Sequence, residues 1–287
     1  MHFVLISVLC SVSVAVLLKY ARKIGLDTWQ MIVWNYPVAI CLTYFIFTPD
    51  LANIHFSELP WVIYLPMAVL LPTLFLLLSN SLRYAGLVQT EVAQRLSLVI
   101  SLLAAVWLFR EQFSVMRSLG IAVGFAAIAC LIGWQKEVGS VTDGWKRWLF
   151  PLTIFVGYGT VDILYKLVAL EKTVAYTTSM FFMFLGAMTL SAIILVTQLV
   201  SKRKVFSSKA MGAGLLLGVL NFGNILFYMK AHRILSDSPS VVFTGMNIGV
   251  IGLGALIGVW LFRERLSLLN VVGILLAVVS VLMIAYL

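Results

Sequence analysis

The sequence predicts an all-α integral membrane protein in which about ten transmembrane helices form two inverted five-helix repeats. Its composition, its regularly spaced apolar runs and an internal repeat predict this class. Of the 287 residues, 62% are hydrophobic and 11% are charged, whereas soluble domains are about 45–50% apolar and about 25% charged. So few charges cannot cover a surface in water, so the lipid bilayer is the expected partner. The net charge of +9 lies in short clusters between apolar runs, which does not favour nucleic-acid binding.

The apolar runs are long enough to cross a bilayer, which takes about 20 mostly apolar residues per helix. The first run, 3–18, lacks the basic segment and the cleavage site of a signal peptide, so we expect a retained helix. The links between runs leave no room for an extramembrane domain. All three cysteines lie inside runs, so we expect no disulfide framework, metal site or cofactor. The other runs lie near 28–47, 61–80, 87–109, 115–134, 148–169, 174–199, 210–230, 238–262 and 268–287.

An internal repeat divides the chain. Residues 106–111 and 259–264 both read Val-Trp-Leu-Phe-Arg-Glu, and Ser114 and Ser267 match at the same offset. The repeat predicts two five-helix units, 1–140 and 147–287. Because each unit has an odd number of helices, the second enters the membrane from the opposite side. Inverted repeats of this kind build transporters that bind substrate near the membrane midplane and expose it to each side in turn.

These features resemble a known family. An apolar helix that ends in Leu-Phe-Arg-Glu, followed by a Ser and a Gly-containing helix, occurs in each half and resembles the drug/metabolite transporter superfamily, more narrowly its EamA-like ten-helix members. The turns at Arg110-Glu111 and Arg263-Glu264 resemble the Gly-Glu turn common in that family, with Arg in place of Gly. The resemblance implies a permease or exporter of small metabolites in the cell membrane. It names no single substrate, because members carry amino acids, nucleotide sugars, phosphorylated metabolites and cationic drugs.

Ionisable residues inside the runs are the first candidates for substrate binding or coupling, because a charge at that depth costs roughly 2.5–3.5 kcal/mol. Glu91 and Arg95 are one helical turn apart and can pair on one face, beside Gln94. Asp162 and Lys166 repeat this spacing. In the functional interpretation these groups line a polar cavity and an acid takes up a proton. In the structural one they neutralise each other between helices, or Lys166 extends to the membrane interface.

Amide and phenol groups inside the runs are further candidates. Asn35 and Tyr36 precede Pro37, which frees a backbone carbonyl in its helix. Asn247 occupies the repeat position of Gln94, so the two amides are expected to lie symmetrically. Hydrogen bonds between helices are the structural alternative for all these groups. The remaining two candidates, three residues apart on one face of the eighth run, are Asn221 and Asn224.

Glycines at Gly-x-x-x-Gly spacing are expected to let helix backbones approach closely inside the bundle. They do not predict a dimer, and the oligomeric state is left open. The pairs are Gly120/Gly124, Gly214/Gly218, Gly245/Gly249 and Gly254/Gly258.

The mixture of acids, bases and amides favours a small polar or zwitterionic metabolite as substrate, with protons as a candidate coupling ion. A cationic drug exporter is the alternative. An enzyme is not expected, because His2, His55 and His232 are isolated and neither Gly-x-Ser-x-Gly nor His-Glu-x-x-His occurs. A channel or a structural membrane protein remains as a different class, although no ring-forming pore motif is present.

Positive charge alternates between the loops. Thirteen of the 20 Lys and Arg residues flank the loops after the odd-numbered runs, and six lie on the other side. The positive-inside rule then places both termini outside the cytosol. The resembled family is usually drawn with both termini in the cytosol, so the two indications disagree.

Overall fold

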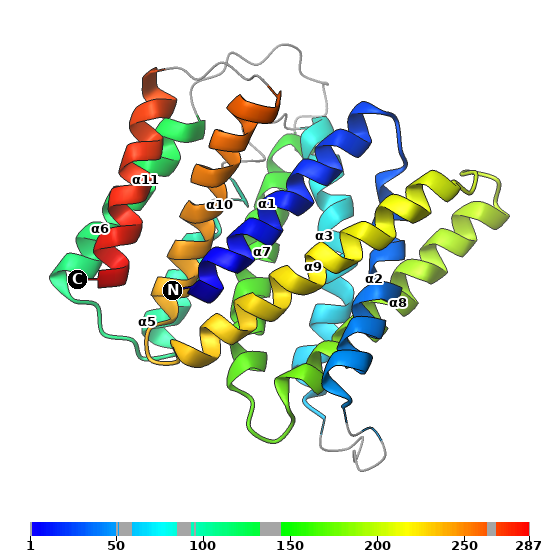
Figure 1. The fold of residues 1–287 in the computed structure, drawn as a ribbon, viewed down its shortest axis with the longest axis horizontal. Helices are drawn as coiled ribbons and strands as arrows, with labels where there is room; N and C mark the ends of the chain where they lie inside the picture. The colour runs from blue at the N-terminus through cyan, green and yellow to red at the C-terminus, as the bar shows by residue number, and fades with distance from the viewer. Residues whose placement is uncertain are drawn as a thin grey trace.

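The computed structural model describes residues 2–49, 51, 59–84, 93–94, 96–132, 145–262 and 268–286. In these residues the chain is helical and has no strand, which confirms the predicted fold class (Figure 1). Helices α2, α7, α8, α9 and the first part of α3 are long and apolar enough to cross a membrane. The ten helices are α1 (His2–Lys23), α2 (Thr28–Phe47), α3 (Trp61–Tyr84), α5 (Leu98–Trp107), α6 (Val115–Ile132), α7 (Lys146–Leu170), α8 (Tyr176–Val200), α9 (Ser208–Ile234), α10 (Pro239–Phe262) and α11 (Leu268–Tyr286).

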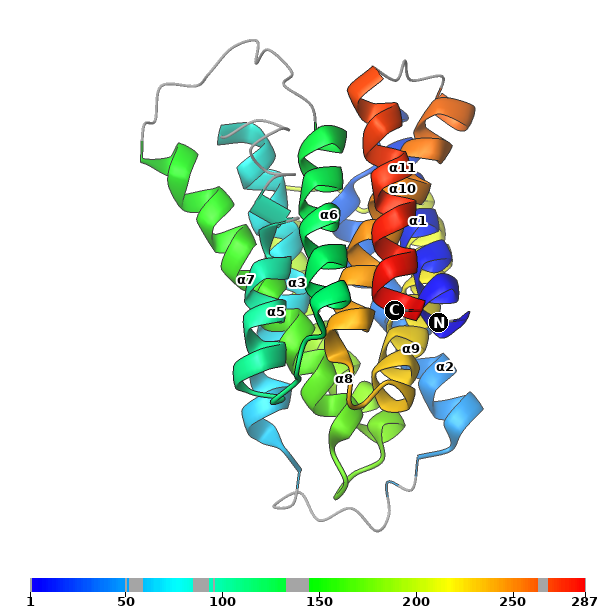
Figure 2. The same ribbon diagram turned by 90° about the vertical axis from the view of Figure 1, so that its left-hand side faces the viewer.

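Helices from the two halves of the chain pack against each other instead of forming two separate clusters. Helix α9 packs on α1 and α2, and α3 packs on α7 and α8. Figure 2 shows α6 and α11 side by side, although they come from opposite halves. Several contacts have a counterpart with the halves exchanged: α1 on α9 corresponds to α7 on α3, and α2 on α9 corresponds to α8 on α3.

Asp27, the N-cap residue of α2, joins two loops at one end of the bundle. Its carboxylate accepts hydrogen bonds from the backbone N–H groups of Trp29 and Gln30 and lies 2.6 Å from Nζ of Lys204 in the α8–α9 loop. Burial alone would raise the pKa of Asp27, but Lys204 and the two N–H groups outweigh it and hold the pKa below its ordinary value. The α1–α2 and α8–α9 loops therefore meet at the same end.

The backbones of α2 and α9 touch at two glycines. A Cβ atom on Gly214 would lie 2.7 Å from the carbonyl oxygen of Met31, and one on Gly218 would lie 2.6 Å from that of Asn35. Only glycine allows such an approach. The close approach predicted for the Gly214/Gly218 pair is therefore present, and its partner is α2.

The other predicted glycine pairs are less uniform. Gly120 uses its carbonyl, which accepts a hydrogen bond from Ser280. No atom of the described residues lies within 4 Å of a Cβ added to Gly254, so the close approach predicted for the Gly254/Gly258 pair is not found at its first member. The second member, Gly258, belongs to α10, but its surroundings lie outside what the structure describes. The remaining members of the pairs are Gly124, which faces Ile248 and Ser280, Gly249, which faces Val8, and Gly245, which is buried in α10.

We predict that Gly218→Ala lowers the free energy of unfolding by about 1–3 kcal/mol, because the α2 backbone must move to admit the methyl group. Thermal unfolding in detergent measures the effect. Gly212→Ala is the matched control on the same helix, because no atom lies within 4 Å of its added Cβ. Equal stability of the two variants would contradict the close contact.

Candidate functional site

A carboxylate lies where α5, α7 and α9 meet. Asp162 on α7 accepts a hydrogen bond on Oδ1 from the Tyr228 hydroxyl of α9 at 3.0 Å. Its Oδ2 accepts one from the Ser101 hydroxyl of α5 at 3.1 Å. Asp162 is half-buried, so part of it stays accessible between these helices. The sequence identified the acid but neither hydroxyl partner.

Two tyrosines lie at this carboxylate. The Tyr228 hydroxyl donates to it, and the rings of Tyr165 and Tyr228 are perpendicular, with centroids 5.9 Å apart. Among the described residues no Lys, Arg or His forms an ion pair with Asp162. The predicted candidate Asp162 thus belongs to a polar centre with Ser101 and Tyr228. The predicted candidate Tyr36, in contrast, is a buried residue of α2, 1% exposed.

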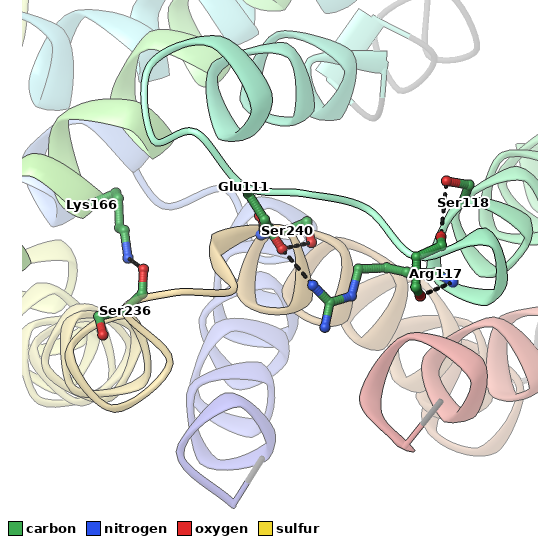
Figure 3. A network of polar contacts seen from close by, with 7 residues as sticks. Glu111, Arg117, Ser118, Lys166, Ser236 and Ser240 are labelled. Atoms are coloured by element: carbon green, nitrogen blue, oxygen red, sulfur yellow. Dashed lines mark hydrogen bonds and ion pairs between the residues drawn. The ribbon is translucent and has the colours of Figure 1, made fainter.

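Lys166 lies one turn beyond Asp162, but its partners are elsewhere. Its ammonium donates to the carbonyl of Ser236 at 2.8 Å (Figure 3) and to that of His232 at 3.3 Å, and it lies 5.6 Å from the Phe109 ring. A cation is favourable there because helix carbonyls point outward at the C-terminus of α9. The ion pair inferred from the spacing is therefore not formed, and Lys166 is fully buried instead of reaching the interface.

Glu111 fastens the same end of the bundle. Its carboxylate accepts hydrogen bonds from the backbone N–H and the hydroxyl of Ser240, at 2.9 and 2.6 Å. It also pairs with Arg117 at 2.9 Å (Figure 3). The neighbouring Arg110 has φ 55°, a left-handed conformation that glycine adopts without cost. The Gly-Glu turn of the resembled family carries glycine at this position, and the acid of the turn joins α10 to the α5–α6 connection.

The amide candidates connect helices. Asn221 donates to Asn35 Oδ1 at 2.9 Å and so joins α9 to α2, while Asn35 donates to the carbonyl of Ile32. Ser7 of α1 donates to both the side-chain and the main-chain oxygen of Asn224, at 2.8 and 2.9 Å. These contacts match the structural alternative, hydrogen bonds between helices.

The remaining candidates do not come together in the described residues. Asn247 donates to the carbonyl of Phe243, one turn earlier in its own helix. The carbonyl of Gln94 accepts the Ser97 hydroxyl. Within the described ranges no three His, Cys, Asp or Glu residues cluster closely enough for a metal ion. The pair expected on the fourth run, Glu91 and Arg95, lies outside the described residues.

The fold and this centre define a helical membrane protein with a polar site between its two halves. Comparison with known proteins agrees. Residues 1–133 match the model of the EamA-like transporter family. Over 292 residues the chain is 38% identical to an uncharacterized protein of Haemophilus influenzae, covering 100% of this chain and 98% of that relative.

A solved crystal structure shares the fold, with a TM-score of 0.72 and 13% sequence identity over 99% of this chain and 95% of its own. The chain belongs to the EamA-like transporter family, within the drug/metabolite transporter superfamily. It is thus a membrane transporter by family, and the members of this family are transporters, not enzymes.

We predict that Glu111→Ala lowers the free energy of unfolding by about 2–4 kcal/mol, because the N-terminus of α10 and Arg117 lose a buried charged partner. Thermal unfolding in detergent measures this loss. Glu171→Ala is the control, because the hydrogen bonds of this carboxylate among the described residues go to its neighbours Lys172 and Thr173. The N–H and hydroxyl of Thr173 lower the pKa of Glu171, but the contact is local, and a loss as large as that of Glu111→Ala would refute the interpretation.

Proposed function

We propose that the chain is a secondary transporter that moves a small polar or zwitterionic metabolite across the cell membrane by alternating access, with Asp162 as the coupling group. The observation that carries this proposal is the Asp162 carboxylate at the meeting point of three helices, without an ion-paired partner among the described residues. An ionisable group inside a membrane bundle marks a functional site by default.

The chemistry of the site favours exchange at Asp162. Hydroxyl hydrogen bonds from Ser101 and Tyr228 orient the carboxylate, and no base in the described ranges compensates its charge. A proton or the ammonium group of a substrate can supply that compensation. Because one carboxylate cannot hold both, binding of either opposes binding of the other, and this competition couples their movements.

Alternating access is supported by how the halves pack. We propose that residues 1–140 and 147–287 are inverted repeats. The exchange of α1 on α9 for α7 on α3, and of α2 on α9 for α8 on α3, is the pattern that a pseudo-two-fold axis would produce. Two such states, related by exchange of the halves, would open the site to opposite sides of the membrane.

A cationic drug is the second candidate substrate. The observation in its favour is the pair of tyrosines at Asp162: Tyr228 donates to the carboxylate, and the ring of Tyr165 packs against that of Tyr228. Aromatic rings attract cations through their faces. An aromatic enclosure with one carboxylate would accept a lipophilic cation as well as a substrate ammonium.

We predict that Asp162→Asn abolishes proton-driven uptake in proteoliposomes, with a loss of at least about tenfold, because a neutral amide can exchange neither a proton nor a cation. The substrate panel consists of amino acids, nucleotides, sugars and cationic dyes, with and without a proton gradient. Transport of an amino acid supports the first candidate, and transport of dyes only supports the second.

The control for this assay is Glu171→Gln, which removes a carboxylate that, in the part of the chain the structure describes, accepts hydrogen bonds from Lys172 and Thr173. It is expected to transport like the wild type at matched reconstitution. Undiminished proton-driven uptake in Asp162→Asn would remove Asp162 from the mechanism.

The orientation of the chain follows from the charge asymmetry of its loops. Because thirteen Lys and Arg residues lie on one side and six on the other, we propose that the termini face away from the cytosol. A C-terminal reporter that is active only in the cytosol is then expected to stay inactive, while the same reporter inserted at Ser207 of the α8–α9 loop is active. The reverse pattern would show the opposite orientation.

A further inference from the structure

His232 is an anomaly of the interior. It lies in the last turn of α9 and is 0% exposed. Within the part of the chain that the structure describes, neither Nδ1 nor Nε2 has a hydrogen-bond partner. Buried polar side chains nearly always have a partner, so an unpartnered one calls for an explanation. The helix-end histidine that looked isolated in the sequence is enclosed by the bundle.

Two aromatic rings contact the imidazole. Its ring centroid lies 4.7 Å from that of Tyr228, one turn earlier on α9, and 4.8 Å from that of Phe243 on α10. The two basic neighbours on α9 turn to other helices: Lys230 lies over the ring of Phe3 on α1, and Arg233 lies over a ring at the start of α8. The imidazole is thus left between the two aromatic rings.

Two rows of polar residues lead from the polar centre to the bundle end, and His232 belongs to the row on α9. The row on α7 consists of Asp162 and Lys166. The row on α9 consists of Tyr228 and His232, followed by Ser236 in the α9–α10 loop. Hydrogen bonds join the two rows at both ends. At the inner end Tyr228 donates to Asp162, and at the outer end Lys166 donates to the main-chain carbonyl of Ser236.

The charged groups among the described residues at the outer end are Lys166, Glu111 and Asp237. The Lys166 ammonium of α7 donates to the main-chain carbonyl of His232. Glu111 lies on the α5–α6 connection and Asp237 on the α9–α10 connection. Asp237 follows Ser236 and is exposed, so the outer end of the rows lies next to the surface of the bundle. The inner end is the carboxylate that the proposed function makes the coupling group.

We propose that His232 is a proton relay between the aqueous α9–α10 end and Asp162, with Tyr228 as the last carrier. The imidazole accepts a proton on its unprotonated nitrogen and turns its other N–H toward Tyr228. The Tyr228 oxygen takes that proton while its own hydroxyl proton passes to Asp162 Oδ1. Afterwards the imidazole and the phenol are neutral as before and Asp162 is protonated.

The surroundings of His232 favour brief transfer of a proton through the imidazole over lasting protonation of it. A relay must release its proton as readily as it takes it up. The neighbouring ammonium of Lys166 and the aromatic walls both oppose a lasting positive charge on the imidazole. Unpartnered nitrogens leave one site to receive and one to donate, with no hydrogen bond to break first. This inference rests on the proposed role of Asp162 in proton coupling.

The test follows protonation of Asp162 itself and needs no substrate. Purified protein in detergent is subjected to a rapid downward pH jump, and stopped-flow infrared spectroscopy records the C=O band of protonated carboxyl groups. The band that Asp162→Asn removes belongs to Asp162. We expect His232→Phe to keep the amplitude of this band but to slow its appearance by roughly 10²-fold, the scale of a lost proton-transfer group.

Two further variants separate a relay from a packing role. Tyr228→Phe removes the last carrier and is expected to slow the band similarly. Thr244→Val is the matched control, because this buried hydroxyl also has no hydrogen-bond partner in the described ranges but belongs to neither row of polar residues. The rate in this variant should equal that of the wild type. Thermal unfolding confirms that each variant is folded.

The outcomes are distinct. An unchanged rate in His232→Phe overturns the relay and leaves the proposed function intact. Equal slowing in Thr244→Val also overturns it, because the effect would then come from packing. Absence of any band that depends on Asp162 overturns both the relay and proton coupling, while substrate counterflow in proteoliposomes still measures transport.

Discussion

A polar group inside a membrane bundle is stabilised by partners within the protein, because the hydrocarbon offers none. Asp162 shows how this constraint shapes the molecule. Its two oxygens are served by hydroxyl groups from α5 and α9, so the three helices must meet at this point. The same constraint explains the cross-half contacts of Asn35 with Asn221. Polar bonds therefore join the two halves of the chain where apolar packing in lipid would give little preference for one arrangement.

The sequence predicts the helices and the interior acid but not the partners of that acid. Apolar runs of sufficient length define the helices locally, and Asp162 stands out because a charge at depth is rare. Ser101 and Tyr228 are ordinary residues of apolar helices, and they lie 61 and 66 positions away along the chain. Lys166 illustrates the opposite error: helical spacing favoured an ion pair with Asp162, but the C-terminal carbonyls of α9 are closer to its ammonium. Such choices depend on tertiary packing, which periodicity does not contain.

The contacts of Glu111 show what the repeated hexapeptide does in the structure. The sequence identifies the repeat but does not show what the turn does. In the structure the acid holds Ser240 at the beginning of α10, and the preceding Arg110 adopts a left-handed conformation. Two features of the motif are thus structural, since one residue shapes the turn and the next fastens a helix from the other half.

The close contact between α2 and α9 also has a consequence for biosynthesis. Asn35 and its partner Asn221 are 186 residues apart. The α2 carbonyls and the α9 glycines that they contact are separated by a similar length of chain. At synthesis rates of about 5–20 residues per second, this delay lasts about 10–40 s. During that time α2 is already made but its partner has not left the ribosome. The nascent first half must therefore survive in the membrane with its future contact surface uncovered.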